Sequence, residues 1–403
     1  MSEESLCTHA HAIDSPGNDS LFNAGFISLT ALFFLTASAM AAFFQLQPYL
    51  QSIHVNAVWI GFIIGADSLA SFIIQPVCAP YFHQGNGRLW MTVGILVMAA
   101  SLFAYTSGRS LGALVTIRII QGAGFVCFLA AMMAAIVAYI PPSRSGQGFG
   151  ILSLVRLFPY AVVPPVMTFL MGCSVTFPDI LAGFALLISF SLMLLFFVRP
   201  VVRSNSDAQT GGIGPVGIRG AIEGLKDRWI LALLAVNLLV FICYAAVFFY
   251  ILGYGRSAGI HRTDLFFTIA TIMMVVVRLF GSALFDKFDK RRMAAWCLVI
   301  LATAFLFLPY GREWGFYFLA SIFGLGWGVL MPLVNAMVFD ASAPHLRGIN
   351  LNLALVAMQG GFFLGPFAGG IILAGTGYTV LFILCSLLSF IALACLALKK
   401  RKE

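Results

Sequence analysis

The sequence predicts an all-α polytopic membrane protein with about twelve transmembrane helices in two pseudo-symmetric six-helix bundles. Of the 403 residues, 61% are hydrophobic and only 9% are charged, whereas a soluble domain usually carries about 25% charged residues. One long polar interval divides the apolar stretches into two blocks of similar length. A chain so poor in charge cannot cover a water-facing surface, which excludes a soluble globular protein.

The chain divides into five predicted segments, which differ in composition. They are a cytosolic N-terminal tail at 1–22, an N-terminal bundle at 23–198, a cytosolic linker at 199–228, a C-terminal bundle at 229–398, and a basic cytosolic tail at 399–403. The linker is rich in Gly, Ser and basic residues, which is typical of a solvated tether. The first residues lack the basic start and apolar core of a secretory signal peptide, so the first span itself is expected to direct insertion.

A membrane-spanning helix needs about 20 mostly apolar residues. Six such stretches precede the linker, at 24–48, 57–80, 88–107, 111–137, 147–171 and 179–198. Six more follow it, at 229–252, 265–285, 293–310, 315–338, 351–374 and 377–397. Because the connections are mostly short, sequential helices are expected to be antiparallel neighbours.

The basic residues predict the orientation of these spans. If both termini are cytosolic, 16 of the 23 Lys and Arg residues fall in inner loops, 4 in outer loops and 3 within spans. Positive charge accumulates on the cytoplasmic side of membrane proteins. The net charge of +8 therefore reports orientation in a cytoplasmic (inner) membrane and not nucleic-acid binding.

Neither a metal site nor a cofactor site is predicted. The eight Cys residues form no CxxC pair, and none of the six His residues lies well inside a span. The sequence also lacks the GxxxxGK[ST] loop that cradles nucleotide phosphates. An intramembrane enzyme would need converging nucleophiles or acid–base groups near one interface, so the sequence does not predict an enzyme.

Three ionisable residues within spans are the candidates for a coupling or charge network: Asp67, Arg118 and Arg156. Charged groups inside a membrane are expensive and by default indicate function. Asp67 can serve as a coupling carboxylate, as a structural partner of an Arg on span 4 or 5, or as a cap at a helix break. Arg156 can contact substrate or pair with Asp67, whereas Arg278, nearer the inner end of span 8, could reach water and is expected to have a structural role.

Three motifs resemble those of the major facilitator superfamily. Span 4 contains Arg118-Ile-Ile-Gln121-Gly122-Ala-Gly124, which is similar to the family's RxxQGxG motif. The loop from Gly281 to Arg292 is similar to its GxLaDRxGRR motif, and a degraded first-half copy ends at Arg88. Span 11 carries a GxxxGPxxGG string similar to the antiporter motif, which the family usually has in span 5.

The resemblance implies a loop latch, a central cavity and closely packed helices. The implied latch residues are Asp286, Arg291 and Arg88. In the resembled fold, spans 1, 2, 7, 10 and 11 line the cavity; with Arg156, the expected lining residues are Gln45, Gln75, Asn237, Tyr250, Trp327, Asn335 and Gln359. The expected packing and hinge residues are Gly122, Gly124, Gly361, Gly365, Pro366, Gly369 and Gly370.

These observations predict a secondary active transporter that moves a small organic solute by alternating access. A proton-coupled exporter that acts as a monomer is the leading hypothesis. Uptake or facilitated diffusion of a sugar or organic anion is the alternative, and a transport-fold sensor or assembly protein is the alternative from another class. The expected partners are a small-molecule substrate, a proton and the lipid bilayer.

Overall fold

The computed structural model describes residues 21–78, 86–141, 144–198, 223–280 and 288–398, and within these ranges every regular element is a helix. This confirms the all-α prediction. The predicted tails, most of the linker and the loop residue Asp286 lie outside the described residues, so the predictions made for them stay predictions.

Six predicted spans of the first half are present as helices. Span 1 is α1 (Ala24–Ala41), a short 3-10 helix η2 (Ala42–Gln45) and α2 (Leu46–Ser52). The next five are α3 (Ala57–Cys78), α4 (Gly87–Ala104), α5 (Leu111–Ile136), α6 (Ser145–Gly172) and α7 (Phe177–Ser191), with 3-10 turns η5 (Val137–Tyr139) after α5 and η7 (Leu192–Phe197) after α7.

The second half repeats this number of spans. Its helices are α9 (Arg228–Ser257), α10 (Leu265–Phe280), α12 (Lys290–Phe307), α13 (Glu313–Ala341), α14 (Arg347–Gly375) and α15 (Tyr378–Ala397), with 3-10 turns η9 (Leu308–Tyr310) and η10 (Pro344–Leu346). Among the described residues, eleven helical segments are long and apolar enough to cross a membrane, and α10 is a shorter apolar helix. The prediction of about twelve spans is therefore confirmed.

Polar side chains fix where several of these helices begin. The Asn23 side chain accepts a hydrogen bond from the backbone N–H of Phe26, and Asp227 does the same at the start of α9. Thr176 and Asp179 form a reciprocal capping box at α7. Such caps satisfy backbone donors that the first turn of a helix leaves free.

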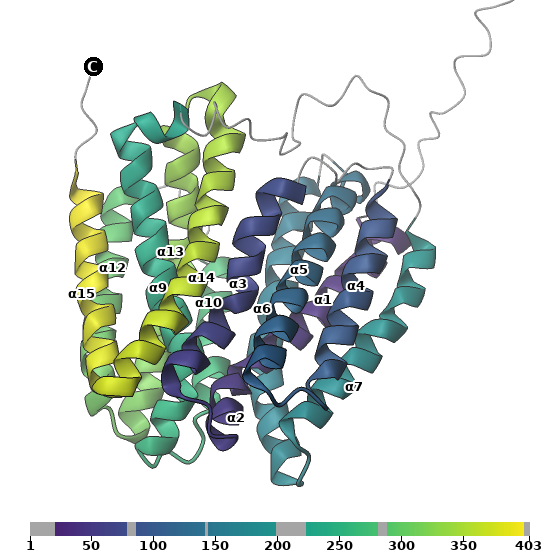
Figure 1. Cartoon of the computed structure of the whole chain (residues 1–403). Coiled ribbons are helices and arrows are strands. Elements are labelled where there is room, and N and C mark those ends of the chain that lie inside the picture. The colour runs from purple at the N-terminus through teal and green to yellow at the C-terminus, as the bar shows by residue number, and fades with distance from the viewer. Residues whose placement is uncertain (1–20, 79–85, 142–143, 199–222, 281–287, 399–403) are drawn as a thin grey trace, which may run out of the picture.

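The helices pack as two groups that meet along two seams. Figure 1 shows the helices of the first half beside those of the second, with α3 and α14 adjacent at the junction. The other seam joins α6 to α10. The first residue of α1 and the last residue of α15 lie at the same end of the molecule, which we call the predicted cytosolic end. The opposite end is the predicted outer end.

A close backbone approach forms the α3–α14 seam. A side chain at Gly61 would collide with the carbonyl of Pro366, and one at Gly370 would meet the backbone of Ala57 and Gly61. Small residues are common where membrane helices approach this closely. These glycines therefore bring the two halves into contact near the predicted outer end.

A proline in α6 supplies an acceptor for the second seam. Pro165 has no N–H, so the carbonyl of Ala161, four residues earlier, has no helical donor. Thr268 of α10 donates its hydroxyl to that carbonyl at 2.8 Å. The helix therefore keeps its proline without an unsatisfied buried carbonyl, and the bond joins the two halves.

Two further hydrogen bonds cross between the halves at the predicted outer end. Arg256 Nη2 donates to Gln45 Oε1 at 3.1 Å, and Gln47 Nε2 donates to the Tyr378 hydroxyl at 3.2 Å. We call these two bonds the outer polar contacts. In the loop before α10, Arg262 donates two hydrogen bonds to the carboxylate of Asp264, and these bonds raise the pKa of Arg262.

Candidate functional site

Asp67 and Arg118 form a buried ion pair between α3 and α5. Arg118 Nη2 lies 3.3 Å from Asp67 Oδ2, and the exposed fractions of the two side chains are 1% and 12%. Asp67 is the eleventh residue of the continuous helix α3, so it lies near mid-depth and does not cap a helix break. Of the partners that the sequence left open for Asp67, the structure places Arg118 beside it.

Other groups also hold the Arg118 guanidinium. Nη1 donates to Gln121 Oε1 at 2.9 Å, and Nη2 donates to the carbonyl of Ile64 at 3.3 Å. The guanidinium carbon stands 4.1 Å from the centre of the Phe43 ring, within cation–π range. Arg118 thus keeps several favourable contacts that do not depend on the charge of Asp67.

Gly122 brings the helix of Arg118 against the helix of Asp67. A side chain at Gly122 would collide with the backbone of Asp67 itself. Because only glycine permits this approach, the RxxQGxG segment places its arginine within reach of the carboxylate on α3.

A second cluster, the two-arginine cluster, contains Ser153, Arg156 and Tyr160 of α6, Tyr244 of α9 and Arg278 of α10. Arg278 Nη1 donates a hydrogen bond to the hydroxyl of Ser153. Arg156 lies about one turn further along α6, and it repels Arg278 electrostatically. Arg278, for which we expected a structural role, reaches across the α6–α10 seam to a residue of the other half.

Tyr160 lies four residues after Arg156, on the same face of α6, and within range of the charges of both Arg156 and Asp67. Its ring lies 5.5 Å from Phe248 of α9, measured between ring centres. Tyr160 therefore packs against a helix of the second half.

Aromatic rings of the second half surround Tyr244, a member of the two-arginine cluster. The Tyr244 ring centre lies 4.5 Å from that of Trp327 and 6.0 Å from that of Phe323. Trp327 is almost completely buried, and its indole N–H has no hydrogen-bond partner among the described residues. Trp327, predicted as a cavity residue, thus lies behind Tyr244 and contributes to this aromatic wall.

Three other predicted cavity residues are engaged in hydrogen bonds between helices. Gln45 accepts the bond from Arg256, Asn237 donates to the carbonyl of Ala354 at 2.6 Å, and Tyr250 donates to the carbonyl of Pro366 at 2.6 Å. Gln75 and Gln359 are half-buried, and Asn335 is exposed. Their predicted contact with substrate stays a prediction.

The predicted packing glycines lie at helix–helix contacts. In α14, Gly361 and Gly365 face α9, Gly369 faces the ring of Tyr250, and Gly370 faces α3. In the first half, Gly124 faces α4. At each of these positions a side chain would meet the neighbouring helix.

The predicted latch residues are only partly described. Arg291 donates to the carbonyls of Leu396 and Ala397 at the end of α15, at 2.8 and 2.7 Å. Arg88 lies over the ring of Phe196, 5.3 Å from its centre. Any contact with Asp286 lies outside the described residues.

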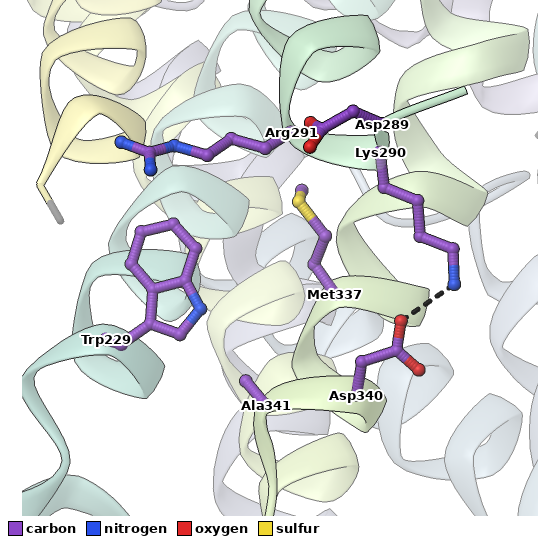
Figure 2. Close-up of a pocket in the computed structure, with 7 residues that line it drawn as sticks. All are labelled: Trp229, Asp289, Lys290, Arg291, Met337, Asp340 and Ala341. Atoms are coloured by element: carbon purple, nitrogen blue, oxygen red, sulfur yellow. Dashed lines mark hydrogen bonds and ion pairs between the residues drawn. The ribbon is translucent and has the colours of Figure 1, made fainter. Parts of the chain in front are cut away.

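Arg291 also borders an open pocket of about 300 Å³ at the predicted cytosolic end of the second half. Figure 2 shows its lining residues, with an ion pair of 2.7 Å between Lys290 Nζ and Asp340 Oδ2 on one side. The guanidinium of Arg291 lies 5.4 Å from the centre of the Trp229 ring. The lining residues are Trp229, Asp289, Lys290, Arg291, Met337, Asp340 and Ala341.

Reasoning from the sequence missed three members of the two-arginine cluster: Tyr160, Tyr244 and Ser153. A Tyr or Ser within an apolar span is common, so composition alone does not distinguish these residues. Tyr160 lies four residues after Arg156, which places both on one helix face, and that spacing is the one signal that could have singled it out. Within the described part of the chain, no group of three or more His, Cys, Asp or Glu could hold a metal ion.

Two curated relatives are similar to this chain. The quinolone resistance protein NorA of Staphylococcus aureus (strain MRSA252) is 24% identical over 147 residues, which span 33% of this chain and 38% of NorA. The staphylopine export protein of Staphylococcus aureus (strain Mu50 / ATCC 700699) is 21% identical over 387 residues, covering 92% of this chain and 94% of that protein. The chain thus matches well under half the length of NorA.

Solved structures share the fold at low sequence identity. The nucleoside transporter NupG has a TM-score of 0.75 at 13% identity, covering 93% of this chain and 99% of that chain. A bacterial homolog of the human lysosomal transporter Spinster, in an inward-facing and unoccupied conformation, has a TM-score of 0.74 at 15% identity, covering 94% of this chain and 97% of that chain.

The family model of the Major Facilitator Superfamily matches residues 26–348 and 257–403. The chain therefore belongs to the Major Facilitator Superfamily, a family of membrane transporters.

Proposed function

We propose that this protein is a proton-coupled secondary transporter that exports a small organic solute by alternating access. It resides in the cytoplasmic (inner) membrane with both termini in the cytosol, and it works as a monomer. The observation that carries the proposal is the Asp67–Arg118 ion pair, because it combines a titratable carboxylate at mid-depth with a cation that has other partners.

The geometry of the pair suits reversible protonation. Asp67 contacts Arg118 through one oxygen–nitrogen pair at 3.3 Å, which is weaker than a bidentate arginine–carboxylate contact. If Asp67 takes up a proton, Arg118 still has Gln121, the Ile64 carbonyl and the Phe43 ring. Breaking the pair therefore leaves no bare cation in the membrane, which lowers the free energy needed to load and release a proton.

Alternating access is supported by the way the halves meet. Among the described residues, the outer polar contacts are the outermost hydrogen bonds between the halves, and the Arg278–Ser153 bond is the innermost. Ser153 lies about 12 Å from the first residue of α6, which begins at the predicted cytosolic end. This distribution favours a state closed at the predicted outer end. Opening that end requires these bonds to break, as the rocking of two repeats around a central site would do.

Two observations favour export. The GxxxGPxxGG string occupies α14 at the α3–α14 seam, and it is similar to a motif of antiporters. The similar proteins NorA and the staphylopine export protein are named for quinolone resistance and for export.

The test uses purified full-length protein in proteoliposomes that contain a pH-sensitive dye, with an imposed proton gradient and a panel of organic anions, sugars and lipophilic drugs. We expect one class of compound to move protons with the wild type and not with Asp67→Asn. Asn keeps the size of Asp and removes its titration. Glu313→Gln makes the same carboxylate-to-amide change at an exposed position in the first turn of α13, so it serves as the matched control and should retain coupled flux.

Two results would contradict the proposal. Solute flux without proton movement in the wild type would make the protein a facilitator, with Asp67 and Arg118 as structural residues. Uphill transport that Asp67→Asn leaves unchanged would remove the coupling role from this carboxylate.

A further inference from the structure

The two-arginine cluster contains more positive charge than the protein itself neutralises. Arg118 faces Asp67, but neither Arg156 nor Arg278 has a carboxylate partner among the described residues. Every described carboxylate other than Asp67 lies in a loop or within one turn of a helix end. Arg278 bonds Ser153, which lies about one turn before Arg156 on α6, so the two cations lie near each other where the halves meet.

Such an arrangement is unfavourable unless something compensates it. Arginines inside a membrane protein must find a carboxylate, backbone carbonyls, water or a ligand. Arg278 has only the Ser153 hydroxyl, and its Nε is buried without a hydrogen-bond partner among the described residues. Arg156 is exposed and forms no hydrogen bond within the described part of the chain. Both guanidinium groups therefore have N–H groups that lack an acceptor among the described residues.

The position of the pair between the halves is also informative. Arg156 belongs to the first half and Arg278 to the second, and Tyr244 on α9 interacts electrostatically with both. An anion held by both guanidinium groups would attract one half to the other. Its binding would thereby be coupled to the relative position of the halves, as a transported solute requires.

The groups around the arginines indicate the rest of the ligand. Tyr160 and Tyr244 are half-buried and provide aromatic surface, which favours a flat apolar body. Guanidinium groups match carboxylate or phosphate oxygens in charge and in geometry. We propose that the solute is an amphipathic organic anion, whose acidic group binds between Arg156 and Arg278 and whose aromatic or apolar part lies on Tyr160 and Tyr244.

This inference rests on the proposed transport function, but its test measures binding, which needs no transport. Purified full-length protein in lipid nanodiscs is titrated with 1-naphthoate, benzoate and phenyl phosphate, and separately with neutral 1-naphthamide and cationic 1-naphthylmethylammonium. Isothermal calorimetry gives the affinities. We expect at least one of the anions to bind, and the amide and the ammonium compound to bind at least tenfold more weakly than the carboxylate of matched shape.

Variants then locate the anion. Arg156→Gln and Arg278→Gln should each weaken anion binding about tenfold or more, which corresponds to the loss of one charge-assisted hydrogen bond. Arg156→Lys keeps the charge and should retain part of the affinity. Arg312→Gln removes the same charge from an exposed position in a predicted outer loop and should bind anions as the wild type does. Size-exclusion profiles of all variants verify that they are folded.

The outcomes separate the two proposals. Binding of none of the three anions, equal binding of 1-naphthamide, or unchanged binding in both glutamine variants would overturn the anion inference. If a neutral or cationic solute is transported with proton coupling and needs neither arginine, the inference fails while the proposed function stands. Anion binding that depends on both arginines, without any transport in proteoliposomes, would support the inference and refute the proposed function.

Discussion

At the scale of single residues, the Asp67–Arg118 pair is asymmetric. Arg118 has Gln121, a backbone carbonyl and an aromatic face in addition to the carboxylate. Asp67 has Arg118 and, at 3.5 Å, the hydroxyl of Ser68. Removing the cation therefore strips the carboxylate of its main partner, whereas removing the carboxylate's charge leaves the cation supported.

This asymmetry predicts unequal effects on stability. Arg118→Met, which keeps length and removes charge, should lower the free energy of unfolding by about 3 kcal/mol or more, because it leaves a buried carboxylate unpaired. Asp67→Asn should cost less, and adding it to Arg118→Met should recover part of the loss. Thermal unfolding midpoints in detergent, measured for the four members of this double-mutant cycle, check the order. Equal losses in the two single variants would show that Arg118 depends on Asp67 as much as the reverse.

At the scale of elements, the α3–α14 seam depends on the absence of side chains. Gly61 and Gly370 lie against each other's backbone, and Gly65 lies against Phe363. Rings of Phe62, Phe363 and Phe367 pack on the flank of the seam, with Phe62 about 6 Å from each of the other two. The seam thus combines a backbone contact with an aromatic cluster, and both halves contribute to each.

Adding one methyl group at this seam should separate the helices. Gly370→Ala should lower the free energy of unfolding by about 1–3 kcal/mol through overpacking, although alanine is the better helix former by about 1 kcal/mol. Gly183→Ala, in the middle of α7, is the matched control, since nothing lies within 4 Å of its added carbon. That variant should be neutral or slightly more stable in the same unfolding measurement. A stable, active Gly370→Ala would mean that the seam can widen at little cost.

At the scale of the whole molecule, two side-chain hydrogen bonds join the halves at the predicted outer end among the described residues. The outer polar contacts join η2 and α2 of the first half to α9 and α15 of the second. A side chain at Gly253 would collide with Gln47 and Tyr378, so the backbone of α9 comes close at the same place. The equilibrium between states closed and open at this end should respond to these contacts.

Weakening them should open the predicted outer end. In the double variant Arg256→Gln/Tyr378→Phe, spin labels at positions 52 and 257, on a background depleted of native Cys, should show a distance distribution shifted to larger values. Each lost hydrogen bond shifts the equilibrium by about 1 kcal/mol, or roughly fivefold in population. Tyr310→Phe, at an exposed tyrosine near the same end, should leave the distribution unchanged. An unshifted distribution in the double variant would assign closure to apolar packing.

Much of the architecture could be predicted from the sequence. Hydropathy predicts a span because a bilayer requires a continuous apolar helix whatever its neighbours are. The same rule places Asp67 and Arg118 within spans, since that depends only on position along one helix. The motif Arg118–Gly124 indicated the family, and its first glycine packs on the backbone of Asp67 itself.

The sequence by itself determined the fold class, the spans and the list of buried charges, whereas only the tertiary structure decided which charges meet. Asp67, Arg118 and Arg156 lie at depths similar enough that either arginine could have been the partner. The choice depends on helix rotation and packing, and the Gly122 contact brings Arg118 to the carboxylate. Arg278 joins Ser153 across 125 positions of sequence. No hydrophobic periodicity along the chain predicts this contact, because it arises only when α6 packs against α10.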